Sequence, residues 1–349
     1  MARTALVTGA TGTIGGALVP ALLDEGWAVR VLTRHPDALD AAWRGRVSVA
    51  EGDAADAALL GRALHGADVA YYLLHSMDAR GDFVARDRAL ATGFADAARA
   101  AGTGRIVYLS GLHPGGHLSP HLASRVEVGE ILLDSGVPTA VLQAGVVLGA
   151  GSASFAMLRH LTERLPVMVG PRWLTNRIQP IALADVVHYL VRAADLPPEV
   201  NRTLDIGMDE VLTYAGMMRR YARIAGLRPR LVATVPVLTP WLASHWVGLI
   251  TPVSAAIAKP LVGSLIHEAV RRETDAADLL GDPAGGLLGY DEAVRRALAG
   301  ADPKRWGRRF AVVGAALVAC ALAGALSALV PARPRHSPEP RPERKADAR

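Results

Sequence analysis

The sequence has a single cysteine, Cys320, among its 349 residues. One thiol excludes an intramolecular disulfide framework and a cysteine metal centre, and the histidines show no metal-ligand spacing. Such cysteine usage is typical of a folded domain that faces a reducing, cytosolic compartment. The net charge of +5 is modest, and the basic residues are skewed toward the C-terminus from Lys304 onward, so no nucleic-acid partner is expected.

What the sequence does have is a glycine-rich turn near its start. Gly9, Gly12 and Gly15 follow a short apolar run at residues 4–8 and precede apolar residues that recur every four positions. The glycines therefore lie at a strand-to-helix junction, as a dinucleotide-binding turn requires. Gly9 permits the tight turn, Gly12 lets the backbone approach a pyrophosphate, and Gly15 lets the helix pack closely. The alternative is an ordinary tight turn. The predicted cofactor contacts here are Gly9, Thr11, Gly12, Thr13, Ile14 and Gly15.

The second predicted strand, residues 27–33, leads into Arg34 and not into an acidic residue. An Asp or Glu at this place accepts the ribose 2′-hydroxyl of NAD, whereas an Arg pairs with the 2′-phosphate of NADP. The sequence therefore predicts NADPH as the cofactor in preference to NADH. The alternative is a solvated basic residue at a strand end.

Two further cofactor contacts are expected after the third and fourth strands. Asp53 follows a short strand at 47–49, where its carboxylate can reach an adenine amino group or cap the helix that starts near Asp56. His75 follows a strand at 69–74. Open α/β sheets bind their ligands at the carboxyl ends of their strands, so His75 is expected to face the cofactor.

Strands and helices alternate through the first 150 residues, with further strands at 105–110 and 138–143 and helices at 82–101 and 121–135. This pattern predicts an α/β, Rossmann-type, doubly wound parallel sheet that binds NAD(P). From residue 151 the alternation becomes irregular. We therefore expect a smaller substrate lobe over residues 151–303, partly interleaved with the first domain.

Together these residues resemble the atypical and extended short-chain dehydrogenases/reductases. The resemblance spans roughly residues 3–300 and is strongest toward the NAD(P)-binding branch with NmrA-like regulators and a short-chain-like accessory subunit of respiratory complex I. It implies that Asp185 opens a helix near the substrate lobe, and it implies no particular substrate. The matching stretches are Thr8–Gly15, Gly52–Asp53, Ile106–Ser110, His121–Glu130, Ile178–Ile181, Asp185–Val186 and Asp205–Gly207.

The chain departs from this family at the helix after the fifth strand. Catalytically competent members carry Tyr-x-x-x-Lys there, whereas the matching positions are His121 and Arg125, and no lysine precedes Lys259. Ser110, His121 and Arg125 remain the candidate catalytic residues. Arg125 lies on the same helix face as His121 and is expected to hold ribose hydroxyls, while its charge disfavours the imidazolium of His121. The alternative is that His121 only begins the helix and Arg125 only holds the cofactor.

Two segments of the C-terminal half are strongly apolar. Residues 231–258 carry no charge apart from His245 and are interrupted by prolines, so we expect buried short helices or an apolar mouth that touches a bilayer. Residues 310–330 are uncharged, and a helix of this length matches a hydrocarbon core of about 30 Å. The aromatic and basic residues at 304–309 suit the cytoplasmic interface. The sequence therefore predicts a single-pass transmembrane helix in the cell membrane, a cytoplasmic main domain and a disordered tail at 331–349.

Three functions fit these features. The first is a membrane-anchored, NADPH-dependent oxidoreductase acting on an apolar or quinone-like small molecule, and slow on simple ketones. The others are an NADPH-sensing protein without turnover and an accessory subunit with a partner in a membrane complex. The polar loop at 113–120 and the separate lobe favour the enzyme, whereas the missing Tyr and Lys favour the other two.

Overall fold

The computed structural model describes residues 2–76, 82–116, 118–235 and 251–303. The predicted transmembrane helix at 310–330 and the predicted tail after it lie outside these ranges. Among the helices inside them, none has the length and apolarity needed to cross a bilayer.

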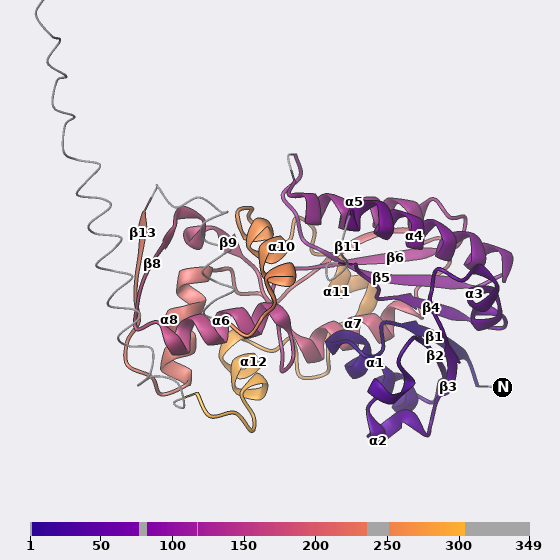
Figure 1. Ribbon diagram of the computed structural model, residues 1–349, viewed down its shortest axis with the longest axis horizontal. Helices are drawn as coiled ribbons and strands as arrows, with labels where there is room; N and C mark the ends of the chain where they lie inside the picture. The colour runs from indigo at the N-terminus through magenta and orange to yellow at the C-terminus, as the bar shows by residue number, and fades with distance from the viewer. Residues whose placement is uncertain (1, 77–81, 117, 236–250, 304–349) are drawn as a thin grey trace, which may run out of the picture.

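Seven parallel strands form the central sheet, in the order β11-β6-β5-β4-β1-β2-β3 (Figure 1). The order reverses between β1 and β4, which is the switch point where such sheets bind ligands at the carboxyl ends of their strands. The doubly wound parallel sheet predicted from the sequence is thereby confirmed. The strands are β1 (Thr4–Thr8), β2 (Ala28–Thr33), β3 (Ser48–Glu51), β4 (Val69–Tyr72), β5 (Arg105–Gly111), β6 (Thr139–Ala144) and β11 (Arg202–Ile206).

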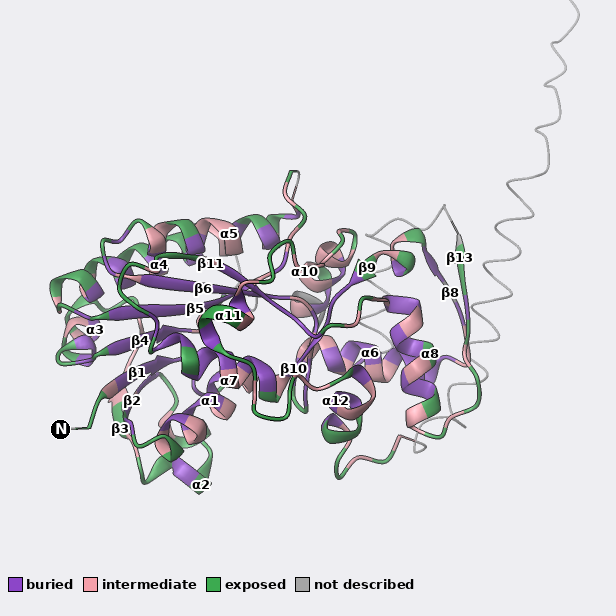
Figure 2. Ribbon diagram, turned by 180° about the vertical axis from the view of Figure 1, so that it is seen from behind, coloured by how far each residue is buried: buried purple, intermediate pink, exposed green. Residues whose placement is uncertain are grey.

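Helices cover both faces of this sheet, so its strands are largely buried on both sides, apart from the exposed edge strand β3 (Figure 2). Alternate side chains of β1 enter different cores: Val7 packs in the cluster with α1 and α7, and Leu6 packs in the cluster with α3, α4 and α5. One face carries α1 (Thr13–Asp24) and α7 (Leu183–Ala193), and the other carries α3 (Ala57–Leu64), α4 (Phe83–Ala100) and α5 (Pro120–Leu133).

A second core builds the C-terminal lobe, beyond the carboxyl ends of the strands (Figure 1). Its methionines, among them Met157, Met168 and Met217, are buried and fill gaps between helices. The helices of the lobe are α6 (Ala153–Arg164), α8 (Tyr214–Ile224), α10 (Ala255–Leu265) and α12 (Tyr290–Ala297). Its short strands are β7 (Val147–Leu148), β8 (Val167–Pro171), β9 (Arg177–Ile178), β10 (Ile181–Ala182), β12 (Leu212–Thr213) and β13 (Leu231–Val235). Single turns complete the fold at η1 (Pro36–Ala38), α2 (Ala41–Arg44), η2 (Arg172–Thr175) and α11 (Ala276–Leu280).

The chain returns to the first domain after residue 150. Strand β11 pairs with β6 at the sheet edge, and α7 packs beside α1. Within α7, the Asp185 carboxylate accepts a hydrogen bond from the backbone N–H of Leu288, at 2.9 Å. Asp185 thus ties this helix to the segment that leads into α12, although the helix itself begins at Leu183.

The expectation of short helices throughout residues 231–258 is wrong at its start. Residues 231–235 form β13, which pairs in parallel with β8, and Leu231 is 65% exposed. Val232, Thr234 and Val235 are β-branched residues, which favour a strand. Pairing with β8 also gives hydrogen-bond partners to backbone N–H and C=O groups that the ends of a short helix would leave unpaired. Residues 236–250 lie outside the described ranges, and α10 begins at Ala255.

Candidate active site

The turn between β1 and α1 leaves no room for a side chain at Gly9 or Gly15. Gly9 has a φ of +69°, and a Cβ atom there would lie 2.6 Å from the carbonyl oxygen of Leu73. A Cβ atom at Gly15 would lie 2.4 Å from the carbonyl oxygen of Gly9. Helix α1 begins directly after Gly12, so its first N–H groups point out of the turn. This backbone cradle fits the pyrophosphate of a dinucleotide.

Two adjoining cavities run along the carboxyl edge of the sheet. The outer cavity lies at the ends of β2, β3 and β4, and the central cavity lies between the glycine turn and the end of β5. Gly9 and His75 line both cavities, so the two lie side by side.

All the site residues predicted from the sequence line these two cavities. The outer cavity is lined by Gly9, Thr11, Arg34, Asp53 and His75. The central cavity is lined by Gly9, Gly12, Thr13, Ile14, Gly15, His75, Ser110, His121 and Arg125.

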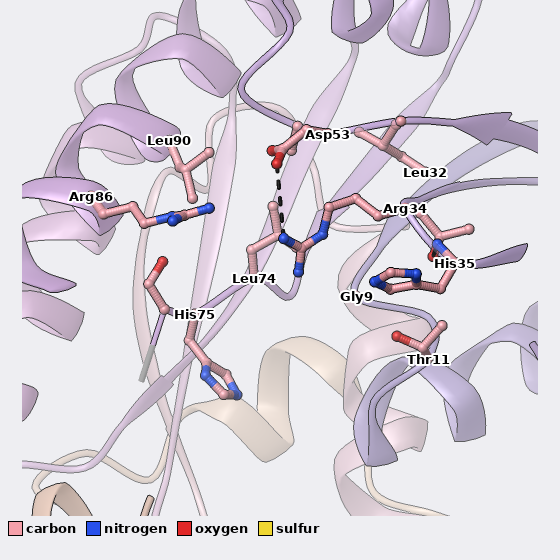
Figure 3. A pocket seen from close by; sticks show the side chains of 14 residues that line it. Gly9, Thr11, Leu32, Arg34, His35, Asp53, Leu74, His75, Arg86 and Leu90 are labelled. Carbon is pink, nitrogen blue, oxygen red and sulfur yellow. Dashed lines mark hydrogen bonds and ion pairs between the residues drawn. The ribbon is translucent and has the colours of Figure 1, made fainter. Parts of the chain in front are cut away.

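In the outer cavity, Arg34 faces Asp53 (Figure 3). The Arg34 Nη1 atom lies 3.9 Å from Asp53 Oδ2, and both side chains are largely exposed, so this ion pair is weak. One of the two roles expected for Asp53 was to cap α3, and this expectation is wrong. The capping residue is Asp56, whose carboxylate accepts from the first N–H groups of that helix, while Asp53 accepts from the N–H of Ala55 at 3.0 Å.

Arg125 lies on α5 and is held in place by contacts with β5, the preceding strand. Its guanidinium donates a hydrogen bond to the carbonyl oxygen of Leu109 in β5 and lies 5.0 Å from the centre of the Tyr108 ring. Arg125 is therefore a fixed cation at the wall of the central cavity. The Ser110 hydroxyl donates to the carbonyl oxygen of Arg125 at 3.3 Å, so it must leave this acceptor before it can polarise a substrate.

His121 lies in the first turn of α5, directly after Pro120, and contacts α10. Its Nδ1 atom lies 2.9 Å from the hydroxyl oxygen of Ser264. Burial, together with the charges of Arg125 and His75, lowers the pKa of His121 to about 3. The sequence predicted the direction of the effect of Arg125, but the larger cause is burial. The imidazole is therefore neutral at physiological pH.

A third, apolar cavity adjoins the central one on the side of the C-terminal lobe. Its walls include Leu122, Met157, Ile178 and Leu261. The residues common to the apolar and central cavities are Gly111, His121, Ala144, Gly145 and Ser154. Of these five, only His121 and Ser154 carry polar side chains.

Ser154, which lies in the first turn of α6, was not predicted from the sequence. Its place is fixed by the segment before it, because the Thr13 hydroxyl donates to the carbonyl oxygen of Gly151 at 2.9 Å. This contact joins the glycine turn to the start of α6. Only its position in the sequence could have indicated Ser154 as a site residue. It follows β6, and segments that follow parallel strands carry ligand contacts.

We expect the chain to lose stability in mild acid through His121. In an unfolded chain its pKa is about 6.5, so between pH 6.5 and 3 the unfolded state binds a proton that the folded state does not. The free energy of unfolding is therefore unaffected by protonation of His121 above pH 6.5. It falls as the pH drops below this value, and the loss reaches about 2 kcal/mol at pH 5. Urea unfolding at pH 7 and pH 5 measures this loss. His121→Phe should show a smaller loss than the wild type, and an equal loss would contradict the assignment.

Comparisons with known proteins agree with this geometry. A family model described as NAD(P)H-binding matches residues 9–142. A ceramide reductase of Caulobacter vibrioides (strain NA1000 / CB15N) is 32% identical over 231 residues, which cover 65% of this chain and 72% of the relative.

Solved structures share the fold over nearly their whole length. The NADPH-dependent quinone oxidoreductase of Escherichia coli, complexed with NADPH, aligns with a TM-score of 0.65 and 20% identity, covering 83% of this chain and 98% of that one. The triphenylmethane reductase of Citrobacter sp., complexed with NADP(H), aligns with a TM-score of 0.64 and 18% identity, covering 84% and 100%. The family match confirms the expected NAD(P)H cofactor. This chain belongs to the NAD(P)H-binding, short-chain dehydrogenase/reductase-like family of Rossmann-fold proteins.

Proposed function

We propose that the protein is an NADPH-dependent reductase of an apolar carbonyl compound, such as a ceramide-related lipid or a quinone-like molecule. The observation that carries the proposal is the junction of two cavities at His121 and Ser154. One cavity holds the dinucleotide turn, and the other has apolar walls that suit a hydrocarbon chain. The ceramide reductase relative supports a lipid substrate.

In this proposal the chain's own residues bind the cofactor and polarise the substrate. When bound, NADPH supplies a hydride. The start of α1 holds the pyrophosphate, and Arg125 holds ribose hydroxyls. The Ser154 hydroxyl donates a hydrogen bond to the substrate carbonyl oxygen and so stabilises the negative charge that develops there. Because His121 is neutral, the proton that completes the alcohol comes from solvent, and quinones and conjugated enones react faster than simple ketones.

Arg34→Ala is expected to weaken NADPH binding by about 1.5–3 kcal/mol, because a charge-assisted contact to the 2′-phosphate is lost. NADH lacks this phosphate, so its affinity should change little. Titrating both cofactors against the wild type and the variant measures the difference. Equal affinity of the wild type for NADH and NADPH would contradict the choice of cofactor.

A second proposal, an NADPH-sensing protein or an accessory subunit of a membrane complex, draws support from the neutral His121 and the missing Tyr and Lys. Purification of the full chain in detergent separates the two proposals. Incubation with NADPH and a lipid extract should show loss of NADPH absorbance and a product heavier by two hydrogen atoms. A stable copurifying partner without turnover would favour the second.

We also propose that residues 310–330 anchor the protein in the cell membrane, with the main domain in the cytoplasm. This proposal rests on the uncharged sequence and on the basic residues before it. Deleting residues 310–349 is expected to move the protein from the membrane pellet to the soluble fraction, with NADPH affinity unchanged. If the shortened chain still sediments with membranes, another segment, such as 231–258, holds it there.

A further inference from the structure

The outer cavity contains a second arginine, Arg86, that was not predicted from the sequence as a site residue. Arg34 enters the cavity after β2, and Arg86 enters it from the first turn of α4. Figure 3 shows the guanidinium of Arg86 directed across the cavity, toward the space beside Asp53 and Arg34. Two cations therefore approach one space from separate elements of the fold.

The helix fixes the direction of Arg86. Leu90, one turn further along α4, lines the same cavity, so both residues belong to one helix face. The next two charged residues face α5 instead: Asp87 accepts from the Ser124 hydroxyl at 3.2 Å, and Arg88 forms an ion pair with Glu127.

The charges around the outer cavity favour an anion. Asp53 lies 3.9 Å from Arg34, whereas no carboxylate of the described ranges lies within ion-pair distance of Arg86. The cavity thus has one more cation than anion among these three side chains. A guanidinium binds phosphate oxygens through paired N–H donors, and two guanidinium groups can bind one phosphate dianion from opposite sides.

We propose that Arg86 binds the 2′-phosphate of NADPH together with Arg34 and so determines cofactor selectivity. The inference rests on the proposed choice of NADPH, and it adds a contact from α4. A different role is stacking of the Arg86 guanidinium on the adenine ring, which NADH and NADPH share. The two roles differ in a binding measurement, because only the phosphate role distinguishes the two cofactors.

The test compares the affinities of NADPH and NADH for the full chain and four variants, by calorimetry or cofactor fluorescence. Arg86→Ala should weaken NADPH binding about ten- to hundredfold and leave NADH binding within about twofold. Arg86→Lys keeps the charge and should recover part of the loss. Arg34→Ala should also lose selectivity. Arg88→Ala is the matched control on the same helix, and both affinities should stay at the wild-type value.

Each outcome is decisive. An equal loss of NADH and NADPH binding in Arg86→Ala would overturn the inference in favour of adenine stacking or a fold defect. If Arg34→Ala loses selectivity and Arg86→Ala does not, the inference fails while the proposed cofactor stands. If the wild type itself does not prefer NADPH, both the inference and the proposed cofactor choice are overturned.

Discussion

Gly15→Ala is expected to weaken NADPH binding by about a hundredfold, equivalent to about 3 kcal/mol. The new Cβ atom would lie 2.4 Å from the carbonyl oxygen of Gly9 and 2.8 Å from the Cα atom of Ala10. Both are backbone atoms, so no side chain can rotate away to relieve the contact. Helix α1 has to move away from the turn, and its first N–H groups then leave the pyrophosphate site.

The neighbouring glycine provides the matched control. A Cβ atom at Gly16 would lie 3.4 Å from the carbonyl oxygen of Ala10, which is close to ordinary contact. Because Gly16 lies inside α1, Gly16→Ala should keep cofactor binding and gain up to about 1 kcal/mol from helix propensity. Cofactor titration measures the affinity of both variants for NADPH, and thermal unfolding measures their stability. Together the two measurements separate an effect on binding from an effect on folding. Equal cofactor affinity of Gly15→Ala and the wild type would show that the dinucleotide binds elsewhere.

On a simple ketone, Ser154→Ala is expected to lower kcat by about a hundredfold. Loss of one hydrogen-bond donor to a developing oxyanion typically has this effect. His121→Phe should also lower kcat, because it removes the second polar side chain at the junction of the two cavities. The loss should be smaller with a quinone, whose conjugation spreads the arriving charge. Steady-state assays of both variants with both substrates measure these effects.

Ser110→Ala is the informative comparison for this reaction. The sequence indicated Ser110 as a candidate catalytic residue, but its hydroxyl already donates to the carbonyl oxygen of Arg125. Its removal should therefore cost less activity than Ser154→Ala. Rapid ketone reduction that neither Ser154→Ala nor His121→Phe impairs would place the reacting carbonyl outside the junction.

The first domain was predictable because its signals are local. A glycine turn, apolar strands and helix periodicity lie within short stretches of sequence, and β1 covers the 4–8 run as expected. The strand at Leu231–Val235 was not predictable in the same way. Its partner β8 lies far away in the sequence, and the surrounding apolar residues and prolines gave no alternating pattern.

The site was predictable only where the motif fixes the position. Gly9 and Gly15 have steric roles that no other residue can fill. Arg86 and Ser154 gave no such signal, since an arginine or a serine in the first turn of a helix is ordinary. Their proximity to the site comes from the packing of α4 and α6 against distant strands. The low pKa of His121 has the same origin, because α10 buries the ring.

The central claim is that a hydride passes from NADPH in the central cavity to a carbonyl group in the apolar cavity. The most direct test incubates the full chain with NADPH that carries deuterium at one or the other transferable position, together with a long-chain lipid ketone, whose reduction leaves the transferred label on carbon. We predict that one of the two labelled cofactors delivers one deuterium to each product molecule formed. Tight NADPH binding with no deuterium in any product would contradict the claim.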